Sequence, residues 1–347
     1  MIMGLVLAII LLLSSTSIIT SQAWYTSTDP WSQSQHDAQH TGANASTSPS
    51  SNSTIWTYDT GGADSRARNI FVDGGRVFAI QGGSFFVLDE TTGAFLLSGT
   101  GGGGYGGNIG GAYANGKIYY TSYDYIYGRG TVYCYNATTG TQLWTYDTTP
   151  GQIQHPPTVS GNRVYVGTLN NYTYCIEDGV QKWYKKLGGP IYSAPAVDGD
   201  LLCIGCDDGK LYAFNIAGAQ PVSLWNFTHG KVIRSPITIK GDKIYFTSNG
   251  GYLYVLNRTN GQLVWSWKAN GNYYLDIAVA YGIVYVDVRA AGWGTYPMYA
   301  LYANVTAGNY TYSDPEPRLW SDTTSIYGFS ARALRSKRVN RYTLMVV

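Results

Sequence analysis

Short runs of alternating apolar and polar residues recur along the chain and are separated by turns rich in glycine and aspartate. Residues 194–227 show this pattern clearly: APAVD (194–198), LLCIGC (201–206), KLYAFN (210–215) and SLWNF (223–227) follow one another with turns between them. Because successive side chains of a β-strand face opposite sides of its sheet, a period of two indicates strands. The unit is predicted to be a four-stranded sheet, and we call its strands A, B, C and D.

The unit recurs with a nearly constant period. A glycine stands before strand B in each copy, and the intervals between these glycines are 41, 45, 38, 42 and 41 residues. The six predicted units cover residues 69–98, 112–146, 157–186, 194–227, 235–267 and 276–320. A period near 40 with four short strands per unit is typical of a β-propeller.

The apolar faces of the strands explain the repetition. Each sheet has two such faces and cannot bury both alone, so neighbouring sheets are expected to pack around a common axis. Four units carry a tryptophan in strand D (Trp144, Trp183, Trp225 and Trp265), which we interpret as a wedge between sheets because an indole buries a large apolar area. The predicted fold is all-β, a propeller of six to seven four-stranded blades.

The two ends of the chain are candidates for closing the ring. Trp56, in STIWTYDT, resembles a strand D that precedes its own strands A, B and C. The basic C-terminal segment 330–347 is expected to supply strands A and B of the same blade, which would remove open sheet edges. This segment lacks the glycine turn, so a truncated copy of a longer ring is the alternative.

The N-terminal sequence predicts export. Residues 1–23 form a signal peptide, with an apolar run at 4–13 and the small residues Ser21 and Ala23 before a cleavage site at Trp24. An uncleaved membrane anchor is the alternative. No second apolar run is long enough to span a bilayer. Residues 24–55 are expected to be a lead-in that straps onto a propeller formed by residues 56–329.

Eight Asn-X-Ser/Thr sequons agree with a secreted, cell-surface location, because such sequons are glycosylated on external surfaces. They begin at Asn44, Asn52, Asn136, Asn171, Asn226, Asn257, Asn304 and Asn309. Charged residues make up only 13% of the chain and its net charge is +2. No basic field is present that would hold nucleic acid through its phosphates.

The repeats resemble the pyrroloquinoline-quinone-like propeller family, also called quinoprotein-like. The units GKLYAFN, GYLYVLNRTNGQLVW and GTVYCYNATTGTQLW are similar to its repeat, and WSQSQHDAQHTGANAS (31–46) resembles the lead-in of secreted archaeal members. The resemblance covers about residues 31–320. It implies a propeller that serves either as a quinone-dependent dehydrogenase with calcium or as a non-enzymatic scaffold.

The sequence lies nearer the scaffold members of that family. Quinone-dependent dehydrogenases are longer and place a calcium ion and a catalytic aspartate beside the quinone, and the alcohol dehydrogenases often join adjacent cysteines. No adjacent cysteines occur here, and no catalytic aspartate with calcium-binding Glu and Asn residues can be matched. We therefore expect no cofactor, except pyrroloquinoline quinone with calcium if the chain is a dehydrogenase.

The cysteines and histidines have structural and functional interpretations. The cysteines (Cys134, Cys175, Cys203 and Cys206) are interpreted as small buried apolar residues, with an inter-blade disulfide such as Cys175–Cys203 as the alternative in an oxidising compartment. His36 and His40 are expected to be structural, because two histidines four residues apart could share a metal on a helix and nothing nearby predicts a helix. No catalytic residues and no metal site are predicted.

The candidate binding surface lies around the channel mouth. Strand A is innermost in a propeller, so residues six or seven positions before each turn glycine should surround the mouth: His155, Ser193, Arg234 and Asp276. The loops between strands B and C open on the same face, and two of them are long and aromatic. They contribute Tyr123, Tyr125, Tyr127, Arg129 and Trp293. Exposed aromatics beside arginine favour recognition of proteins or stacking on sugars.

These observations predict a secreted, glycosylated propeller that acts as a non-enzymatic binding or scaffold module at the cell surface. Its partners would be proteins or glycans, without nucleic acid and without a membrane span after signal cleavage. The alternative is an extracellular carbohydrate-active enzyme or a quinone-dependent dehydrogenase.

Overall fold

The regular structure of the described residues consists of β-strands. The computed structural model describes residues 32, 37–40, 54–59, 67–81, 84–100, 107–269, 274–280, 282–289, 298–302 and 344–345. Within these residues no helix is long and apolar enough to cross a membrane. The predicted signal peptide, residues 1–23, lies outside them.

Six antiparallel sheets follow one another along the chain, and we number them as blades 1 to 6. Blade 1 consists of β2 (Ala67–Asp73), β3 (Arg76–Gln81), β4 (Ser84–Asp89) and β5 (Phe95–Thr100). Blade 2 consists of β6 (Gly107–Ala114), β7 (Lys117–Asp124), β8 (Arg129–Asn136) and β9 (Gln142–Asp147). Blade 3 consists of β10 (Thr158–Ser160), β11 (Arg163–Gly167), β12 (Tyr172–Glu177) and β13 (Val180–Lys186). Blade 4 consists of β14 (Ala196–Asp198), β15 (Leu201–Gly205), β16 (Lys210–Asn215) and β17 (Val222–Thr228). Blade 5 consists of β18 (Thr238–Lys240), β19 (Lys243–Ser248), β20 (Tyr252–Asn257) and β21 (Leu263–Lys268). Blade 6 contains β22 (Tyr274–Ala280), β23 (Ile283–Arg289) and β24 (Met298–Tyr302).

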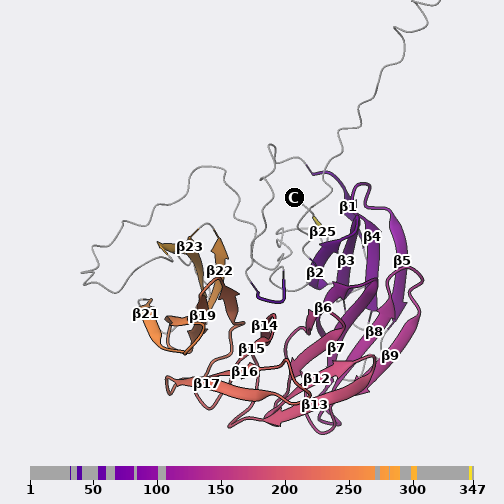
Figure 1. Ribbon diagram of the computed structural model, residues 1–347. Helices are drawn as coiled ribbons and strands as arrows, with labels where there is room; N and C mark the ends of the chain where they lie inside the picture. The colour runs from indigo at the N-terminus through magenta and orange to yellow at the C-terminus, as the bar shows by residue number, and fades with distance from the viewer. Residues whose placement is uncertain are drawn as a thin grey trace, which may run out of the picture.

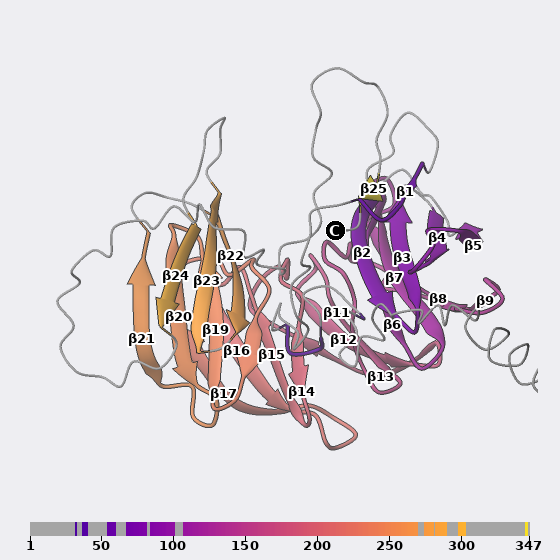
Figure 2. The same cartoon turned by 90° about the horizontal axis from the view of Figure 1, so that it is seen from above.

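The blades are arranged as a β-propeller. Their first strands, β2, β6, β10, β14, β18 and β22, contact one another in chain order. Figures 1 and 2 show the sheets side by side around a centre, with β2, β6, β14 and β22 innermost and β5, β9, β13, β17 and β21 outermost. The all-β propeller fold is confirmed, and the four-stranded repeat is confirmed for blades 1 to 5; blade 6 has three described strands.

One row of side chains across each sheet packs against the next blade. In blade 2 the row is Tyr119, Cys134 and Trp144, which are register partners on strands B, C and D. In blade 3 the same places hold Tyr165, Cys175 and Trp183. Tyr119 and Tyr165 are almost completely buried, and Cys134 and Cys175 are fully buried. An aromatic ring on strand B thus faces a small residue on strand C, which leaves room for the indole.

The predicted wedge role of strand-D tryptophans is visible at glycine turns of the following blade. A Cβ atom on Gly261, in blade 5, would lie 2.4 Å from the ring of Trp225 of blade 4. The Trp225 Nε1 group donates a hydrogen bond to the Arg258 carbonyl in the same turn. Gly261 has φ of +69°, a conformation that glycine adopts without strain. Glycine is therefore required at position 261 for two reasons: the backbone conformation of the turn and the space that the indole occupies.

Trp56 uses the same docking mode on blade 1. Its Nε1 group donates to the Glu90 carbonyl at 2.9 Å, and a Cβ atom on Gly93 would lie 2.5 Å from its ring. The strand that follows it, β1 (Thr57–Tyr58), pairs with β25 (Leu344–Met345). Trp56 thus behaves as the strand-D tryptophan of a blade that precedes blade 1.

The pairing of the chain ends differs in detail from the prediction. Segment 330–347 was expected to supply strands A and B of the closing blade. Within that segment the structure describes only β25, and β25 pairs directly with the strand-D segment β1. Strand D of a blade hydrogen-bonds to strand C, so β25 occupies the place of strand C.

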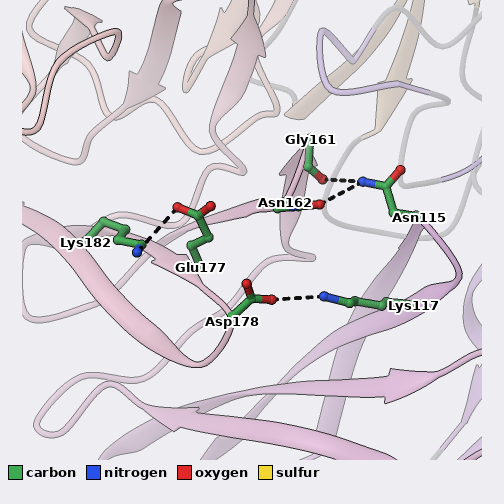
Figure 3. A network of polar contacts seen from close by, with 7 residues as sticks. All are labelled: Asn115, Lys117, Gly161, Asn162, Glu177, Asp178 and Lys182. Carbon is green, nitrogen blue, oxygen red and sulfur yellow. Dashed lines mark hydrogen bonds and ion pairs between the residues drawn. The ribbon is translucent and has the colours of Figure 1, made fainter.

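Polar side chains tie neighbouring blades together on the face of the A–B and C–D turns, which we call the turn face. Between blades 2 and 3 the Lys117 ammonium pairs with Asp178 at 2.9 Å, and the Asn115 amide donates to Gly161 and Asn162 (Figure 3). The start of strand B reaches the C–D turn of the next blade in the same way at Arg76, which donates to the Ala137 carbonyl.

The described part of the lead-in lies at the centre of the ring. The Ala38 and Gln39 carbonyls accept hydrogen bonds from Val197 of β14 and Ile239 of β18. The buried His40 ring lies 3.1 Å from the Ile237 carbonyl through Nδ1 and 3.1 Å from the Thr158 hydroxyl through Nε2. One short segment therefore contacts the innermost strands of blades 3, 4 and 5. His36 lies outside the described residues.

The cysteines are structural. Cys134, Cys175, Cys203 and Cys206 are all buried free thiols, so the disulfide alternative is wrong and the small apolar interpretation is confirmed. Desolvation raises the pKa of the Cys134 thiol to about 12. A thiol so far from ionisation is a poor nucleophile.

Candidate functional site

The face opposite the turns, which we call the loop face, is built from the B–C hairpins and the D–A connections. Three D–A connections reach this face with one repeated sequence pattern: a buried isoleucine, a partly or fully exposed residue, and a polar residue that points inward. The isoleucines are Ile153, Ile191 and Ile233, each with no exposed surface. They anchor the connections, so the residues that follow are held in fixed positions.

His155 and Ser193, predicted to line the channel mouth, are instead buried, and they hold the end of strand B through hydrogen bonds. The Ser193 hydroxyl donates to the Gly205 carbonyl and accepts the Gly205 N–H, both at 3.0 Å. The His155 Nε2 atom accepts the Gly167 N–H at 2.9 Å, and Nδ1 donates to the Pro156 carbonyl. Ser235 repeats the serine pattern on Thr247. These side chains bind the end of strand B and offer no free group to a ligand.

Burial determines the charge state of His155. Desolvation lowers its pKa to about 4, although the hydrogen bonds to Pro156 and Gly167 favour the charged form. The ring is therefore neutral at neutral pH, which agrees with its acceptor role toward Gly167.

The residue one position earlier in each connection is the one that reaches the surface. These residues are Gln154, Tyr192 and Arg234. The Arg234 guanidinium makes a bidentate ion pair with Asp207, with its Nε 2.9 Å and its Nη2 2.6 Å from the carboxylate oxygens. It also stacks on Tyr192, 4.1 Å from the ring centroid. We call Tyr192, Asp207 and Arg234 the mouth cluster.

Arg234 was predicted from its place in the repeat, whereas Tyr192 and Asp207 were missed. The rule of six or seven positions before the turn glycine mixed two sets of residues. The position seven residues before the glycine holds Tyr192 and Arg234, and the position six residues before it holds the buried His155 and Ser193. Strict use of seven would have found Tyr192. Asp207 lies in a B–C turn, and its partner could be recognised only in three dimensions.

The hairpin between β7 and β8 projects aromatic side chains into solvent. Tyr125, Ile126 and Tyr127 are 61%, 52% and 68% exposed. The tip is ordered by Asp124, whose carboxylate accepts the N–H groups of Ile126 and Tyr127 at 2.9 and 3.1 Å. We call residues 125–127 the hairpin tip.

Arg129 completes this hairpin. Its guanidinium lies 5.6 Å from the centroid of the Tyr127 ring and 3.9 Å from Asp147. Tyr123, the other predicted residue of the hairpin, is half-buried in β7 opposite Gly130. The structure thus brings Tyr125, Tyr127 and Arg129 together as predicted.

Two predicted site residues cannot be placed in the site. Asp276 lies in β22 opposite Asp287, and its side chain is outside the described structure. Trp293 lies outside the described residues. The mouth cluster and the hairpin tip are therefore the described parts of the candidate surface.

The predicted sequons fall at different places. Asn136 and Asn257 end strand C of blades 2 and 5 and open the C–D turns, where each carboxamide oxygen accepts the N–H of the threonine two residues later. Asn226 is exposed on β17, and Asn171 lies in the B–C loop of blade 3. Asn44, Asn52, Asn304 and Asn309 lie outside the described residues. Glycosylation stays a prediction at all eight.

Within the described residues, no group of three or more His, Cys, Asp or Glu side chains is arranged to hold a metal ion. The inner edges of β14 and β18, which face the ring centre, are already hydrogen-bonded to the lead-in at Ala38 and Gln39. The lead-in therefore occupies part of the ring centre, and we assign no step to a quinone or a calcium ion.

Comparison with known proteins identifies the family. The family model described as outer membrane protein assembly factor BamB, a model of PQQ-like repeats, matches residues 100–223, 128–268 and 220–292. These matches together cover more than half of the chain. The chain therefore belongs to this family of PQQ-like β-propellers.

Similar proteins have different activities. A tetrathionate hydrolase of Acidithiobacillus ferrooxidans is 29% identical over 53% of this chain, and the chain covers 42% of that protein, less than half its length. BamB from Moraxella catarrhalis has a TM-score of 0.54 at 16% identity, covering 68% of this chain and 70% of its own. The quinohemoprotein alcohol dehydrogenase of Comamonas testosteroni has a TM-score of 0.62 at 15% identity, covering 75% and 57%. At these identities the two structures show the fold alone.

Proposed function

We propose, from its membership of the PQQ-like propellers, that this chain is a secreted, glycosylated binding or scaffold module at the cell surface. The loop face is its recognition surface, and the hairpin tip and the mouth cluster are the contact points. The proposed partner of the tip is a protein, as would suit a relative of an outer membrane assembly factor.

The observation that carries this proposal is the exposure of an ordered aromatic tip. Folding leaves Tyr125, Ile126 and Tyr127 more than half exposed, although Asp124 fixes the backbone that presents them. Ordered, exposed tyrosines give a large contact area with little further loss of conformational entropy on binding. A protruding tip is suited to a pocket on a partner.

The mouth cluster supplies a second kind of contact. Asp207 and Tyr192 hold the Arg234 guanidinium in one orientation, and the side chain of Arg234 is 40% exposed. A guanidinium fixed in this way can contact a partner without first losing rotamer freedom.

The experiment that tests the proposal compares capture of cell-envelope components by the wild-type protein and by Tyr125→Ala/Tyr127→Ala. We expect the double variant to lose its partner while its far-ultraviolet circular dichroism is unchanged. The matched control is Val222→Ala/Leu224→Ala, which removes side chains that are 62% and 50% exposed on β17. Equal capture by the tip variant and the wild type would refute the tip assignment.

An enzymatic function is the second candidate, and the similarity to a tetrathionate hydrolase favours it. It includes the alternatives of an extracellular carbohydrate-active enzyme and a quinone-dependent dehydrogenase. Purified protein would be assayed for loss of tetrathionate, for sugar release from polysaccharide, and for dye reduction with pyrroloquinoline quinone and calcium. Turnover in any of these assays would replace the scaffold proposal.

A further inference from the structure

Blades 3 and 5 carry the same aromatic arrangement near the loop face, on the side of each blade that faces the previous one. In blade 3, strand C begins with Tyr172 and Tyr174, and Lys186 of strand D is the register partner of Tyr172. In blade 5, Tyr252 and Lys268 are register partners in the same way. The ammonium groups lie 5.8 and 5.0 Å from the centroids of the Tyr172 and Tyr252 rings.

Two further rings complete each arrangement. In blade 3 they are Tyr146, from blade 2, and Tyr184, with centroids 6.2 and 5.7 Å from those of Tyr174 and Tyr172. We call Tyr146, Tyr172, Tyr174, Tyr184 and Lys186 the blade 3 platform.

Four members of the blade 5 platform occupy positions equivalent to those in blade 3, but its fourth ring, His229, follows strand D of blade 4, whereas Tyr184 lies in strand D of blade 3 itself. Phe227, from blade 4, lies 5.7 Å from Tyr254, and His229 lies 5.2 Å from Tyr252, both between ring centroids. This platform consists of Phe227, His229, Tyr252, Tyr254 and Lys268. Two blades of one propeller thus present three rings and one lysine in equivalent positions, and each adds a fourth ring from a different place.

Packing of the propeller does not require this arrangement. In blade 4 the place of Tyr172 is held by Lys210, and in blade 2 it is held by Thr131, which donates to Asp147 at 2.6 Å. Both blades form complete four-stranded sheets. The first tyrosine and its lysine are therefore free to serve another purpose.

The first tyrosine and the lysine of each platform have available polar atoms, whereas the Tyr146 hydroxyl donates to Gln181 and the Tyr254 hydroxyl is hydrogen-bonded to His229. Among the described residues, no carboxylate pairs with Lys186 or Lys268, and no side chain hydrogen-bonds the hydroxyls of Tyr172 and Tyr252. Tyr184 is 54% exposed. Each platform therefore offers aromatic faces, a phenol and an unneutralised cation.

The seam between the two platforms is also basic. The strand-D position that holds Tyr146 in blade 2 and Phe227 in blade 4 holds Lys185 in blade 3, and it faces the blade that carries Lys210. Of the nearby carboxylates on the loop face, Asp207 is neutralised by Arg234, whereas Asp208 accepts the Tyr212 hydroxyl and keeps its charge. The cations Lys185, Lys186, Lys210 and Lys268 outnumber this one carboxylate. Positive charge is thus left over along the three seams from blade 2 to blade 5.

We propose that the two platforms bind an acidic polysaccharide, with a sugar ring against Tyr172 and Tyr252 and a carboxylate of the sugar on Lys186 and Lys268. Aromatic faces suit the C–H groups of a sugar ring, and the ammonium held beside each face complements a uronate. A repeating polymer matches a repeated site, because engagement of one platform raises the effective concentration at the other. This binding surface is separate from the hairpin tip.

The test is affinity electrophoresis of the folded protein in gels that contain polygalacturonate, dextran or poly-glutamate. We expect retardation by polygalacturonate only, and weak retardation by free galacturonate. Lys186→Gln/Lys268→Gln and Tyr172→Ala/Tyr252→Ala should each weaken polymer binding at least about tenfold, and single variants should fall between them and the wild type.

The matched control is Lys240→Gln/Lys243→Gln, which changes the net charge equally but on the turn face. If this control weakens binding as much as the platform variants, non-specific attraction explains the retardation and the proposal is wrong. Equal retardation by poly-glutamate would show that the site recognises negative charge alone and not a sugar. Retardation by dextran, which is uncharged, would show that the lysines are not needed for sugar binding. The tip variant Tyr125→Ala/Tyr127→Ala should bind polygalacturonate normally, so this proposal and that of the tip fail independently.

Discussion

Blade 2 contains two aromatic regions, of which one is buried and the other is exposed. The seam toward blade 3 is built from the row Tyr119, Cys134 and Trp144, whose first two members are fully or almost fully buried. The hairpin tip of the same sheet leaves Tyr125 and Tyr127 61% and 68% exposed. Aromatic content is similar in both, so composition does not separate a packing region from a binding region. What separates them is whether another blade covers the ring.

Among the changes that test the buried regions, a change of pH is expected to have the largest effect on the free energy of unfolding. Burial lowers the pKa values of His40 and His155 to about 4, so the unfolded chain takes up protons between pH 6.5 and 4 that the folded chain does not. Stability is therefore highest above pH 6.5 and falls as the pH drops toward 4. The loss is on the order of 3 kcal/mol for each histidine.

Urea unfolding at pH 7 and pH 4.5 measures this loss. The control is His155→Ser, which places at this position the residue that blade 4 uses in Ser193 to bond the N–H and carbonyl groups of Gly205 at the end of strand B. We expect a smaller difference between the two pH values in this variant. An unchanged difference would show that His155 is not the titrating group.

Truncation in the seam comes next. Trp144→Ala removes a large side chain between blades 2 and 3 and should lower the free energy of unfolding by about 3 kcal/mol. The tip variant Tyr125→Ala/Tyr127→Ala should change it by less than about 0.5 kcal/mol. Urea unfolding measures both, and a tip variant as destabilised as the seam variant would erase the contrast drawn here.

The seam also allows a finer comparison. Among the described residues the Trp144 Nε1 atom is buried without a hydrogen-bond partner, whereas that of Trp225 donates to Arg258. Leaving the Arg258 carbonyl without its donor should make Trp225→Phe more destabilising than Trp144→Phe, by about 1 kcal/mol. The reverse order in thermal unfolding would argue against the docking geometry.

Two glycines of blade 5 separate backbone strain from collision. Gly241 has φ of +60° with nothing within 4 Å of an added Cβ, whereas at Gly261 the Cβ would lie 2.4 Å from Trp225. Gly241→Ala should cost about 1 kcal/mol. Gly261→Ala should cost roughly 2 kcal/mol more, because the indole must move. Equal melting temperatures for the two variants would show that the indole does not rest on this turn.

The smallest effect is expected from the surface ion pair between blades 2 and 3. Lys117 and Asp178 lie 2.9 Å apart, but the side chain of Asp178 is 62% exposed. Lys117→Met should therefore change the free energy of unfolding by less than about 1 kcal/mol, and less again in high salt. A larger change would mean that the polar ties of Figure 3, rather than the aromatic rows, hold the blades together.

The strands and their repetition could be predicted because they depend on local patterns. The predicted strand C of residues 210–215 is observed as β16 with the same bounds, and the glycine period gave the correct order of blades. The exposed hairpin tip was also found, since an insertion in a short repeat has no neighbour that could cover it.

The candidate site could be predicted only in part. Ser193 and Arg234 occupy places six and seven residues before a turn glycine, yet one is buried and the other exposed. One step along an extended chain turns a side chain to the other side, so a count that is uncertain by one residue loses this information. Partners such as Asp207 for Arg234, and Tyr146 for Tyr174, come from different strands or blades, and no local pattern connects them.

The sequence by itself determined the unit of this protein: four alternating strands, turns that need glycine, and an indole that needs a neighbour. These follow from the geometry of the strand and from the burial of apolar area, which act over a few residues. The tertiary structure alone decided which rings are covered, how the lead-in meets the centre through His40, and that Lys186 and Lys268 lie beside tyrosines without a carboxylate partner among the described residues. Those outcomes depend on contacts between blades, and such contacts exist only after the sheets have packed around their axis.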